Sequence, residues 1–186
     1  MLKVLLVRHA IPVFPGSSGL DDHQRPLIPE GIRDALALAQ GLEQTTISAV
    51  YSSPYARAIQ TVQPLAQSRS LEVQTIDDFR EHALARELLA DWRESLELAW
   101  NNFDHRFPGG ETMRETQARG FNALERLKLK HSNGTIAVGG HGTIFSLLLN
   151  AIESRIDCEF HLAMPMPAVY TITHDERWQL ISGPGI

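Results

Sequence analysis

Two histidines follow two apolar segments of the chain, at positions where a nucleophile or an anion-binding group can act. Residues 4–7 form a continuous apolar run typical of a buried strand, and Arg8 and His9 follow it directly. A second apolar tract, residues 135–138, leads through two glycines to His141. In open α/β sheets, ligands bind at the carboxyl ends of strands. Because histidine can attack phosphorus and arginine can hold an anion, these positions predict a phosphate-handling site.

Two further segments carry side chains suited to the same chemistry. Arg57 falls in the first turn of a predicted helix, where free backbone N–H groups and the helix dipole favour an anion. Ser53 is suited to cap that helix, and Pro54 to occupy its first position. Glu81 follows a predicted strand over residues 71–76, and a carboxyl group can transfer protons. The candidate site therefore draws on four separate parts of the chain.

The segments that must position these residues alternate between strand and helix patterns, which predicts an α/β fold. Strands are predicted over residues 3–7, 47–51, 71–76, 135–140, 168–173 and 178–181, the last two as a hairpin. Helices are predicted over residues 29–44, from 53 onward with a kink or an early end at Pro64, and over 86–103, 112–130 and 144–152. We expect a three-layer sandwich with a mainly parallel central sheet. Residues 1–186 are expected to form a single domain with a small helical insertion at about 80–130.

Composition and charge argue against several other classes of protein. The chain has 186 residues, of which 43% are hydrophobic, and this favours a folded core over disorder. A net charge of −5 argues against a nucleic-acid-binding surface, so anion recognition must come from a few converging arginines. The apolar segments are too short for a signal peptide or a membrane span, and the single cysteine, Cys158, excludes an internal disulfide. We therefore expect a cytoplasmic protein with no nucleic-acid or membrane partner.

The order of these motifs resembles the histidine phosphatase superfamily, the phosphoglycerate mutase-like proteins. The motifs that carry the resemblance are Arg8-His9-Ala10, residues 53–61 with Arg57, Glu81, and His141-Gly142. Residues 25–31 also resemble the family's start of its first helix, and residues 107–112 its Pro-Gly-Gly-Glu turn. The resemblance spans almost the whole chain, and the set of motifs in this order is specific.

The resemblance implies hydrolysis of a small phosphorylated substrate in two steps, without a metal or a cofactor, by a phosphatase of the histidine acid type. His9 would attack phosphorus and become phosphohistidine, while Glu81 would protonate the leaving oxygen and then assist water. The groups implied to hold the substrate phosphate are Arg8, Arg57, His141 and Gly142. Nearby arginines favour the neutral His9 that attack needs, and a bound phosphate favours a cationic His141.

The loop after His9 departs from the family pattern. Ala10 stands where glycine is usual, and Pro12 and Pro15 replace residues that would offer polar contacts. This departure motivates one alternative, a non-catalytic protein that binds a phosphorylated ligand. A second alternative is a phosphoglycerate mutase-type phosphotransferase, in which the same residues pass phosphate to a second substrate group.

The proton donor also has alternatives, because the glycine- and tryptophan-rich stretch that often follows the acid is missing after Glu81. Glu87 and Glu111 are possible substitutes. A second anionic group on the substrate has three candidate partners, although a solvated surface charge is the simpler interpretation of each: Arg25, Arg80 and Arg86. Sugar phosphates, nucleotide-derived phosphates, a cobalamin-precursor phosphate and phosphoproteins are all compatible with these motifs.

Overall fold

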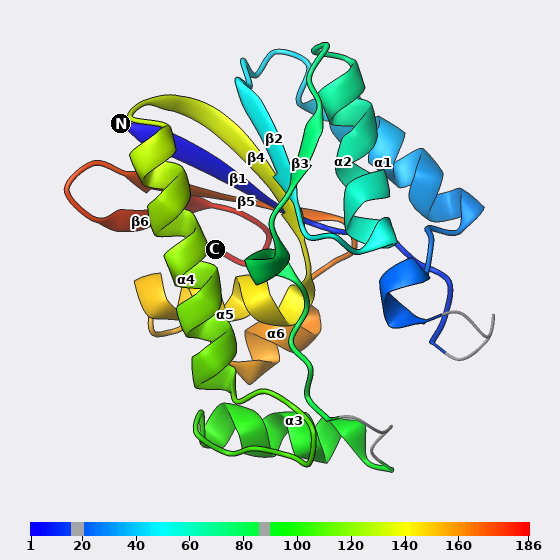
Figure 1. Ribbon diagram of the computed structural model, residues 1–186, viewed down its shortest axis with the longest axis vertical. Coiled ribbons are helices and arrows are strands. Elements are labelled where there is room, and N and C mark those ends of the chain that lie inside the picture. Colours follow the sequence, from blue (N-terminus) through cyan, green and yellow to red (C-terminus); the bar gives the residue numbers. More distant parts are fainter. Residues whose placement is uncertain (16–20, 86–89) are drawn as a thin grey trace.

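The fold is built on one central β-sheet, and the computed structural model that shows it describes residues 1–15, 21–85 and 90–186 (Figure 1). Within these residues the sheet has six strands in the order β3-β2-β4-β1-β5-β6. The strands are β1 (Leu2–Arg8), β2 (Ala49–Ser52), β3 (Val73–Thr75), β4 (Gly134–Gly140), β5 (Ala168–His174) and β6 (Trp178–Ser182). Strands β3, β2, β4 and β1 pair in parallel, and β5 and β6 add antiparallel pairs at one edge. The predicted mainly parallel sheet and its C-terminal hairpin are confirmed.

Helices cover both faces of this sheet (Figure 1). They are α1 (Pro29–Gly41), α2 (Ala56–Gln67), α3 (Trp92–Asn101), α4 (Met113–Lys130), α5 (Gly142–Ile152) and α6 (Cys158–Ala163), with short 3₁₀ helices η1 (Asp22–Gln24) and η2 (Asp77–Phe79). Along β1, Val4 and Leu6 pack with residues of α4 and α5. Leu5 and Val7 pack with residues of α1 and α2 on the opposite face. Because both faces are buried, residues 4–7 of the strand are all apolar, and the predicted three-layer sandwich is confirmed.

The helix after β2 begins later than predicted. Ser53 and Pro54 were expected to open it, but α2 begins at Ala56, and Tyr55 holds the cap position without a side-chain capping bond. The backbone N–H of Ser53 donates to the Gly139 carbonyl at 2.8 Å, so this residue still extends the pairing of β2 with β4. The prediction that Ser53 caps the helix was therefore wrong, because sheet pairing holds its backbone.

Pro64 does not end this helix. It lies inside α2, which continues to Gln67. The next two residues, Leu65 and Ala66, are fully buried against the sheet. Their burial compensates for the backbone hydrogen bond that a proline inside a helix removes.

Helix α3 is shorter than the predicted span of 86–103. The side chain of Asp91 accepts a hydrogen bond from the backbone N–H of Glu94 at 3.0 Å, and this cap sets the start of the helix at Trp92. The predicted helical positions Leu88 and Leu89 lie outside the described residues, as do residues 16–20 of the predicted N-terminal loop. Strand ends elsewhere differ by one or two residues, and α1 ends at Gly41 rather than at 44.

Two other helices show how capping decides a boundary. Helix α4 begins after Thr112, whose side chain accepts from the backbone of Glu115 while the Glu115 side chain accepts from the backbone of Thr112. Helix α6 was not predicted. It has six residues, too few for a hydrophobic period, and its start is set by the Asp157 carboxylate, which accepts from the Phe160 N–H at 2.9 Å.

Helix α3 lies beyond the end of the sheet, beside the first turns of α4 (Figure 1). Leu96 and Trp100 of α3 pack with Met113 of α4 and Leu147 of α5 in a small apolar cluster of their own. The division into one domain with an insertion at about 80–130 stays a prediction. Among the helices that the structure describes, none is both long enough and apolar enough to cross a membrane.

Candidate active site

His9 and His141 meet at the carboxyl edge of the sheet. Each directly follows the end of a strand, β1 for His9 and β4 for His141, and these two strands are parallel neighbours. The backbone N–H of His9 donates to the Gly140 carbonyl at 3.0 Å, and the two imidazole centroids are 5.3 Å apart. The prediction that these two distant segments come together is confirmed.

His9 is held as a neutral imidazole with one nitrogen free. The ring is buried, and its Nδ1 lies 2.8 Å from the carbonyl oxygen of Ala10. A carbonyl only accepts hydrogen bonds, so Nδ1 carries the proton and Nε2 keeps its lone pair. Burial lowers the pKa of His9 to about 4, and the charges of Arg57 and Arg8 act in the same direction against the opposing effect of the Ala10 carbonyl. Nε2 is thus available as a nucleophile at neutral pH.

Ala10 is accommodated where the family pattern has glycine. Its side chain is fully buried and packs with Leu27 and Ala35. Its backbone N–H donates to the hydroxyl of Thr61 at 3.0 Å. Pro12, another departure, forms an isolated antiparallel bridge with Leu27. Ala10 and Pro12 therefore pack against Leu27 next to His9, and these departures leave the site in place.

Arg57 occupies the first turn of α2, as predicted. It is 2% exposed, and its guanidinium donates to the Asp22 backbone carbonyl at 2.7 Å and to the Asp22 carboxylate at 3.1 Å. The guanidinium also lies 4.8 Å from the ring centroid of Tyr55. Its Nε is buried and has no hydrogen-bond partner among the described residues. One donor of this arginine is therefore unpaired in the described structure.

Arg8 shows the same pattern on the other side of His9. Its Nη1 donates to the carbonyl of Met164, and its Nε is buried without a hydrogen-bond partner in the described parts of the chain. A Cβ added at Gly142 would lie 3.1 Å from Nη2 of Arg8, so glycine leaves the space that this guanidinium occupies. The phosphate contact predicted for Gly142 stays a prediction, whereas its contact with Arg8 is a direct feature of the structure.

His141 is fully buried, and its Nε2 lies 2.7 Å from the hydroxyl of Ser53. That hydroxyl oxygen also accepts a hydrogen bond from the Tyr55 N–H at 3.3 Å. The other ring nitrogen, Nδ1, is buried and has no hydrogen-bond partner in the described structure. Burial holds the pKa of His141 well below its usual value, so the ring is neutral before an anion binds.

Glu81 reaches the same edge from the segment that follows β3 and η2. Its carboxylate accepts backbone N–H groups of His82 at 2.8 Å and of Thr143 and Ile144 at 3.1 Å each. The last two belong to the first turn of α5, directly after His141. Burial alone would raise the pKa of Glu81, but these N–H donors together with nearby cationic groups hold it below its usual value. Glu81 is therefore a carboxylate in the ligand-free site.

Comparison with known proteins shows which family these features belong to. The sequence model of the histidine phosphatase superfamily, branch 1, matches residues 4–181. The chain belongs to this superfamily. It is 31% identical to phosphoserine phosphatase 1 of Hydrogenobacter thermophilus over 154 residues, covering 76% of this chain and 71% of that protein. It is 27% identical over 191 residues to a metal-independent phosphoserine phosphatase of Arabidopsis thaliana, covering 95% and 78%.

Solved structures of the superfamily share the fold. A mutant phosphoserine phosphatase from Entamoeba histolytica in complex with phosphoserine superposes with a TM-score of 0.81 at 20% identity, over 100% of this chain and 98% of the other. A mycobacterial glucosyl-3-phosphoglycerate phosphatase with inorganic phosphate superposes with a TM-score of 0.78 at 19% identity, over 97% and 95%. These likenesses confirm the predicted fold.

Glu111 and Glu87 were the predicted alternatives to Glu81 as the proton donor. The Glu111 carboxylate accepts hydrogen bonds from Arg80 and Arg119. Burial alone would raise its pKa, but Arg119, the Ala83 N–H and Arg80 bring that pKa down to about 2. Glu111 is thus a poor source of protons, and Glu87 lies outside the described residues.

The arginines suggested for a second anionic group are largely occupied. Arg80 forms ion pairs with Asp77 and Glu111 at 2.9 and 2.6 Å. Arg25 pairs with Asp22 at 2.6 Å and donates to the Val13 carbonyl at 2.6 Å. Arg86 lies outside the described residues. Both arginines that the structure describes therefore act within the protein rather than presenting a free cation.

Sequence reasoning missed three residues beside the site. Asp22 pairs with Arg57, Ser53 bonds His141, and Tyr55 places its ring 4.8 Å from that of His141. Tyr55 and Ser53 lie in the motif around Arg57, so their place near it was available as a signal. The sequence held no signal for Asp22, because only folding brings η1 to Arg57. In the described parts of the chain, no three His, Cys, Asp or Glu side chains group to hold a metal ion.

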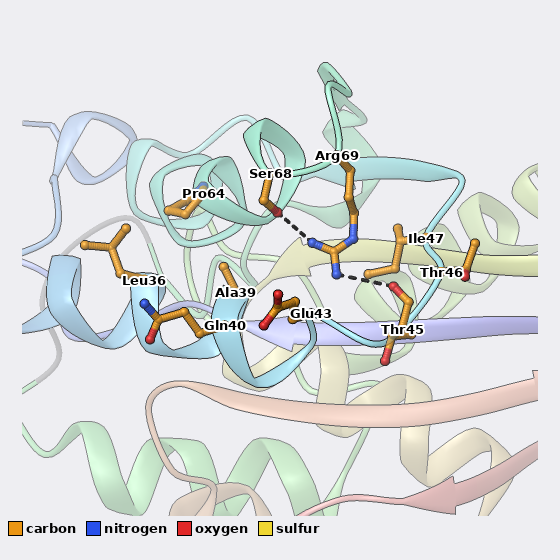
Figure 2. A pocket seen from close by; sticks show the side chains of 10 residues that line it. All are labelled: Leu36, Ala39, Gln40, Glu43, Thr45, Thr46, Ile47, Pro64, Ser68 and Arg69. Atoms are coloured by element: carbon orange, nitrogen blue, oxygen red, sulfur yellow. Dashed lines mark hydrogen bonds between the residues drawn. The ribbon is translucent and has the colours of Figure 1, made fainter.

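A separate surface cavity of about 770 Å³ lies between the C-terminal ends of α1 and α2 (Figure 2). It is lined by Leu36, Ala39, Gln40, Glu43, Thr45, Thr46, Ile47, Pro64, Ser68 and Arg69. Ile47 precedes the first residue of β2, so this cavity is at the amino edge of the sheet, opposite His9. The guanidinium in it, from Arg69, already donates to the Leu42 and Thr45 carbonyls and to the Ser68 hydroxyl. The cavity therefore plays no part in the candidate site.

Proposed function

We propose that this protein is a metal-independent phosphomonoesterase that acts on a small phosphorylated metabolite through a phosphohistidine on His9. One observation carries the proposal. Three buried nitrogen atoms at one sheet edge, Nε of Arg8, Nε of Arg57 and Nδ1 of His141, lack hydrogen-bond partners in the described structure. Leaving buried donors unpaired costs free energy, and a phosphoryl group with its three oxygens would satisfy them. The family match and the phosphatase relatives support the same reaction class.

In the first step, Nε2 of His9 forms a bond to phosphorus while the bond from phosphorus to the leaving oxygen breaks. Glu81 gives its proton to that oxygen. The bound phosphate is a second negative charge beside Glu81, and it raises the pKa of the carboxyl group so that it can hold the proton. The proton on Nδ1 of His9 stays with the Ala10 carbonyl and keeps the ring aligned.

In the second step, water attacks the phosphohistidine, the nitrogen–phosphorus bond breaks, and Glu81 takes a proton from the water. Arg8, Arg57 and His141 stabilise the charge on the phosphoryl oxygens in both steps. A bound dianion also raises the pKa of His141, so this histidine can become a cation once substrate is present. These cationic side chains supply the positive charge that phosphoryl transfer requires, in the manner of the histidine acid type.

Phosphoserine is the first substrate to test. The relatives from Hydrogenobacter thermophilus and Arabidopsis thaliana are both named phosphoserine phosphatases. The structural neighbours also include a phosphatase of glucosyl-3-phosphoglycerate, so phosphorylated hydroxy acids and their sugar conjugates belong in the same screen.

The decisive test is hydrolysis of p-nitrophenyl phosphate and phosphoserine with EDTA present, by the wild type and by His9→Ala. We expect the wild type to release phosphate and His9→Ala to lose at least about 10³-fold in kcat, because the nucleophile is gone. Acid-labile phosphate should be trapped on the wild type and be absent from the variant. Wild-type turnover by His9→Ala would refute the proposal. Phosphoglycerate interconversion faster than phosphate release would favour a mutase instead.

A further inference from the structure

The segment that carries Glu81 has no regular secondary structure, yet one arginine of a neighbouring helix holds its backbone. Residues 81–85 follow η2 without entering a helix or strand. Arg119 of α4 donates from Nη1 to the carbonyls of Asp78 and Arg80, both at 2.8 Å. Its Nη2 donates to the carbonyl of Glu81 at 3.1 Å. Arg119 thus binds three backbone carbonyls within four residues, ending at the candidate proton donor.

Glu111 fixes Arg119 in this position. The Glu111 carboxylate accepts both Nε and Nη2 of Arg119, at 2.9 and 2.8 Å, in a two-pronged pairing. The same carboxylate accepts the side chain of Arg80 at 2.6 Å and the backbone N–H of Ala83 at 3.3 Å. The backbone is therefore tied on both sides of Glu81, before it through Arg119 and after it through Glu111.

A contribution to stability does not by itself account for the Arg119–Glu111 ion pair. The side chains of Arg119 and Glu111 are only 10% and 18% exposed. Desolvating an ion pair offsets much of its attraction, so a buried pair contributes little net stability compared with apolar packing. What the pair does supply is a fixed backbone, and a donor displaced by about 1 Å can lose roughly 10²-fold in rate.

We propose that Arg119 and Glu111 are positioning residues that set the location of Glu81 for proton transfer to the leaving group. The inference rests on the proposed function, because it requires Glu81 to be the proton donor. In the described structure, the hydrogen bonds of both residues are to groups of the protein itself. Their effect reaches the reaction through the backbone of residues 78–83, which they hold against α4.

The test uses the demand of the leaving group for a proton. p-Nitrophenolate leaves without protonation, whereas the alkoxide of an alkyl phosphate such as phosphoserine needs the proton from Glu81. The second step is common to both substrates, so the comparison uses kcat/KM, which reports phosphoryl transfer to His9 and not the later hydrolysis of phosphohistidine. We expect Arg119→Lys and Glu111→Gln to lower kcat/KM on the alkyl phosphate by about 10- to 100-fold and on p-nitrophenyl phosphate by less than about threefold. Glu81→Gln should show the same selectivity with a larger loss on the alkyl phosphate.

The matched control is Arg126→Ala, on the same helix. The Arg126 side chain is 56% exposed and pairs with the side chain of Asp78, not with the backbone of the segment. Its loss should leave both activities unchanged. Melting temperatures of all variants identify any that fail to fold. If Arg119→Lys fails to fold, Glu111→Gln, which leaves the Arg119 side chain in place, decides the test.

Equal losses on both substrates by Arg119→Lys and Glu111→Gln, with a selective loss by Glu81→Gln, would overturn the inference and leave the proposed function intact. An unselective loss by Glu81→Gln would remove Glu81 as the donor and overturn the inference as well. A phosphohistidine mechanism without that donor would still be visible from the loss of activity in His9→Ala. The two failures are therefore distinguishable.

Discussion

Two clusters with buried or half-buried arginines, Arg119 with Glu111 and Arg8 with Arg57, lie near the same edge of the sheet, and they differ in how fully their donors are used. Arg119 makes five hydrogen bonds to Glu111 and to three backbone carbonyls. Arg8 and Arg57, in contrast, each keep a buried Nε with no partner in the described structure, beside the equally unpartnered Nδ1 of His141. A cluster whose donors are satisfied fixes the backbone around it, whereas a cluster with unpaired donors is suited to bind an anion.

The largest expected effect is a loss of activity when the cluster with unpaired donors loses Arg57. Arg57→Ala removes a free donor, and we expect kcat/KM on phosphoserine or p-nitrophenyl phosphate to fall by about 10²- to 10³-fold, because charge in the transition state loses a preorganised partner. Inorganic phosphate should raise the melting temperature of the wild type and raise that of Arg57→Ala much less. Arg33→Ala, an exposed arginine on α1, serves as the control and should behave as the wild type. An unchanged phosphate response in Arg57→Ala would contradict the comparison.

The second effect tests the satisfied cluster by stability. Arg119→Ala leaves the partly buried Glu111 with Arg80 as its remaining cationic partner, and it frees three backbone carbonyls. We expect the free energy of unfolding to fall by about 2–3 kcal/mol, measured by urea denaturation. Phosphate should still raise the melting temperature of this variant as much as that of the wild type. A loss of the phosphate response here would mean that the two clusters are not separate.

The third effect concerns the pH dependence of stability that His9, beside the cluster with unpaired donors, contributes. The folded pKa of His9 is about 4, below the unfolded value of about 6.5, so the unfolded chain binds more protons between these values. Stability should therefore fall as the pH drops through this window. From pH 7 to pH 5, we expect His9 to account for a loss of about 2 kcal/mol. Urea denaturation of the wild type and His9→Gln at both pH values measures this contribution. Equal losses in the two proteins would refute it.

The smallest effect comes from the contact that joins η1 to Arg57 in the cluster with unpaired donors. Asp22 occupies two donor positions of Arg57 in the ligand-free protein. Asp22→Asn removes the negative charge that competes with phosphate, and we expect KM to fall by about threefold with kcat unchanged. Steady-state kinetics at two salt concentrations checks this, since the difference should shrink at high salt. A rise in KM would show that Asp22 instead orients Arg57 for the substrate.

The parts of the site that could be predicted from sequence follow from local patterns. Apolar runs mark β1 and β4 because both faces of each strand are buried, and His9 and His141 come next in the chain. Arg57 could be placed because a helix start is legible within a few residues. The role of Ser53 was misjudged for a related reason. A serine before a proline is typical of a helix cap, but the hydrogen bond from its N–H to the Gly139 carbonyl extends the pairing of β2 with β4 and holds it outside the helix.

By itself, the sequence determined the order of elements, the family and the residue types of the site, since these depend on short-range patterns and on a set of motifs. Only the tertiary structure decided which donors are free and which are satisfied. Arg119 and Arg57 are the same kind of residue on the same kind of helix. What separates them is whether a carboxylate or a carbonyl from a distant part of the chain reaches each nitrogen. Hydrogen bonds act over about 3 Å, so that difference exists only once the chain has folded.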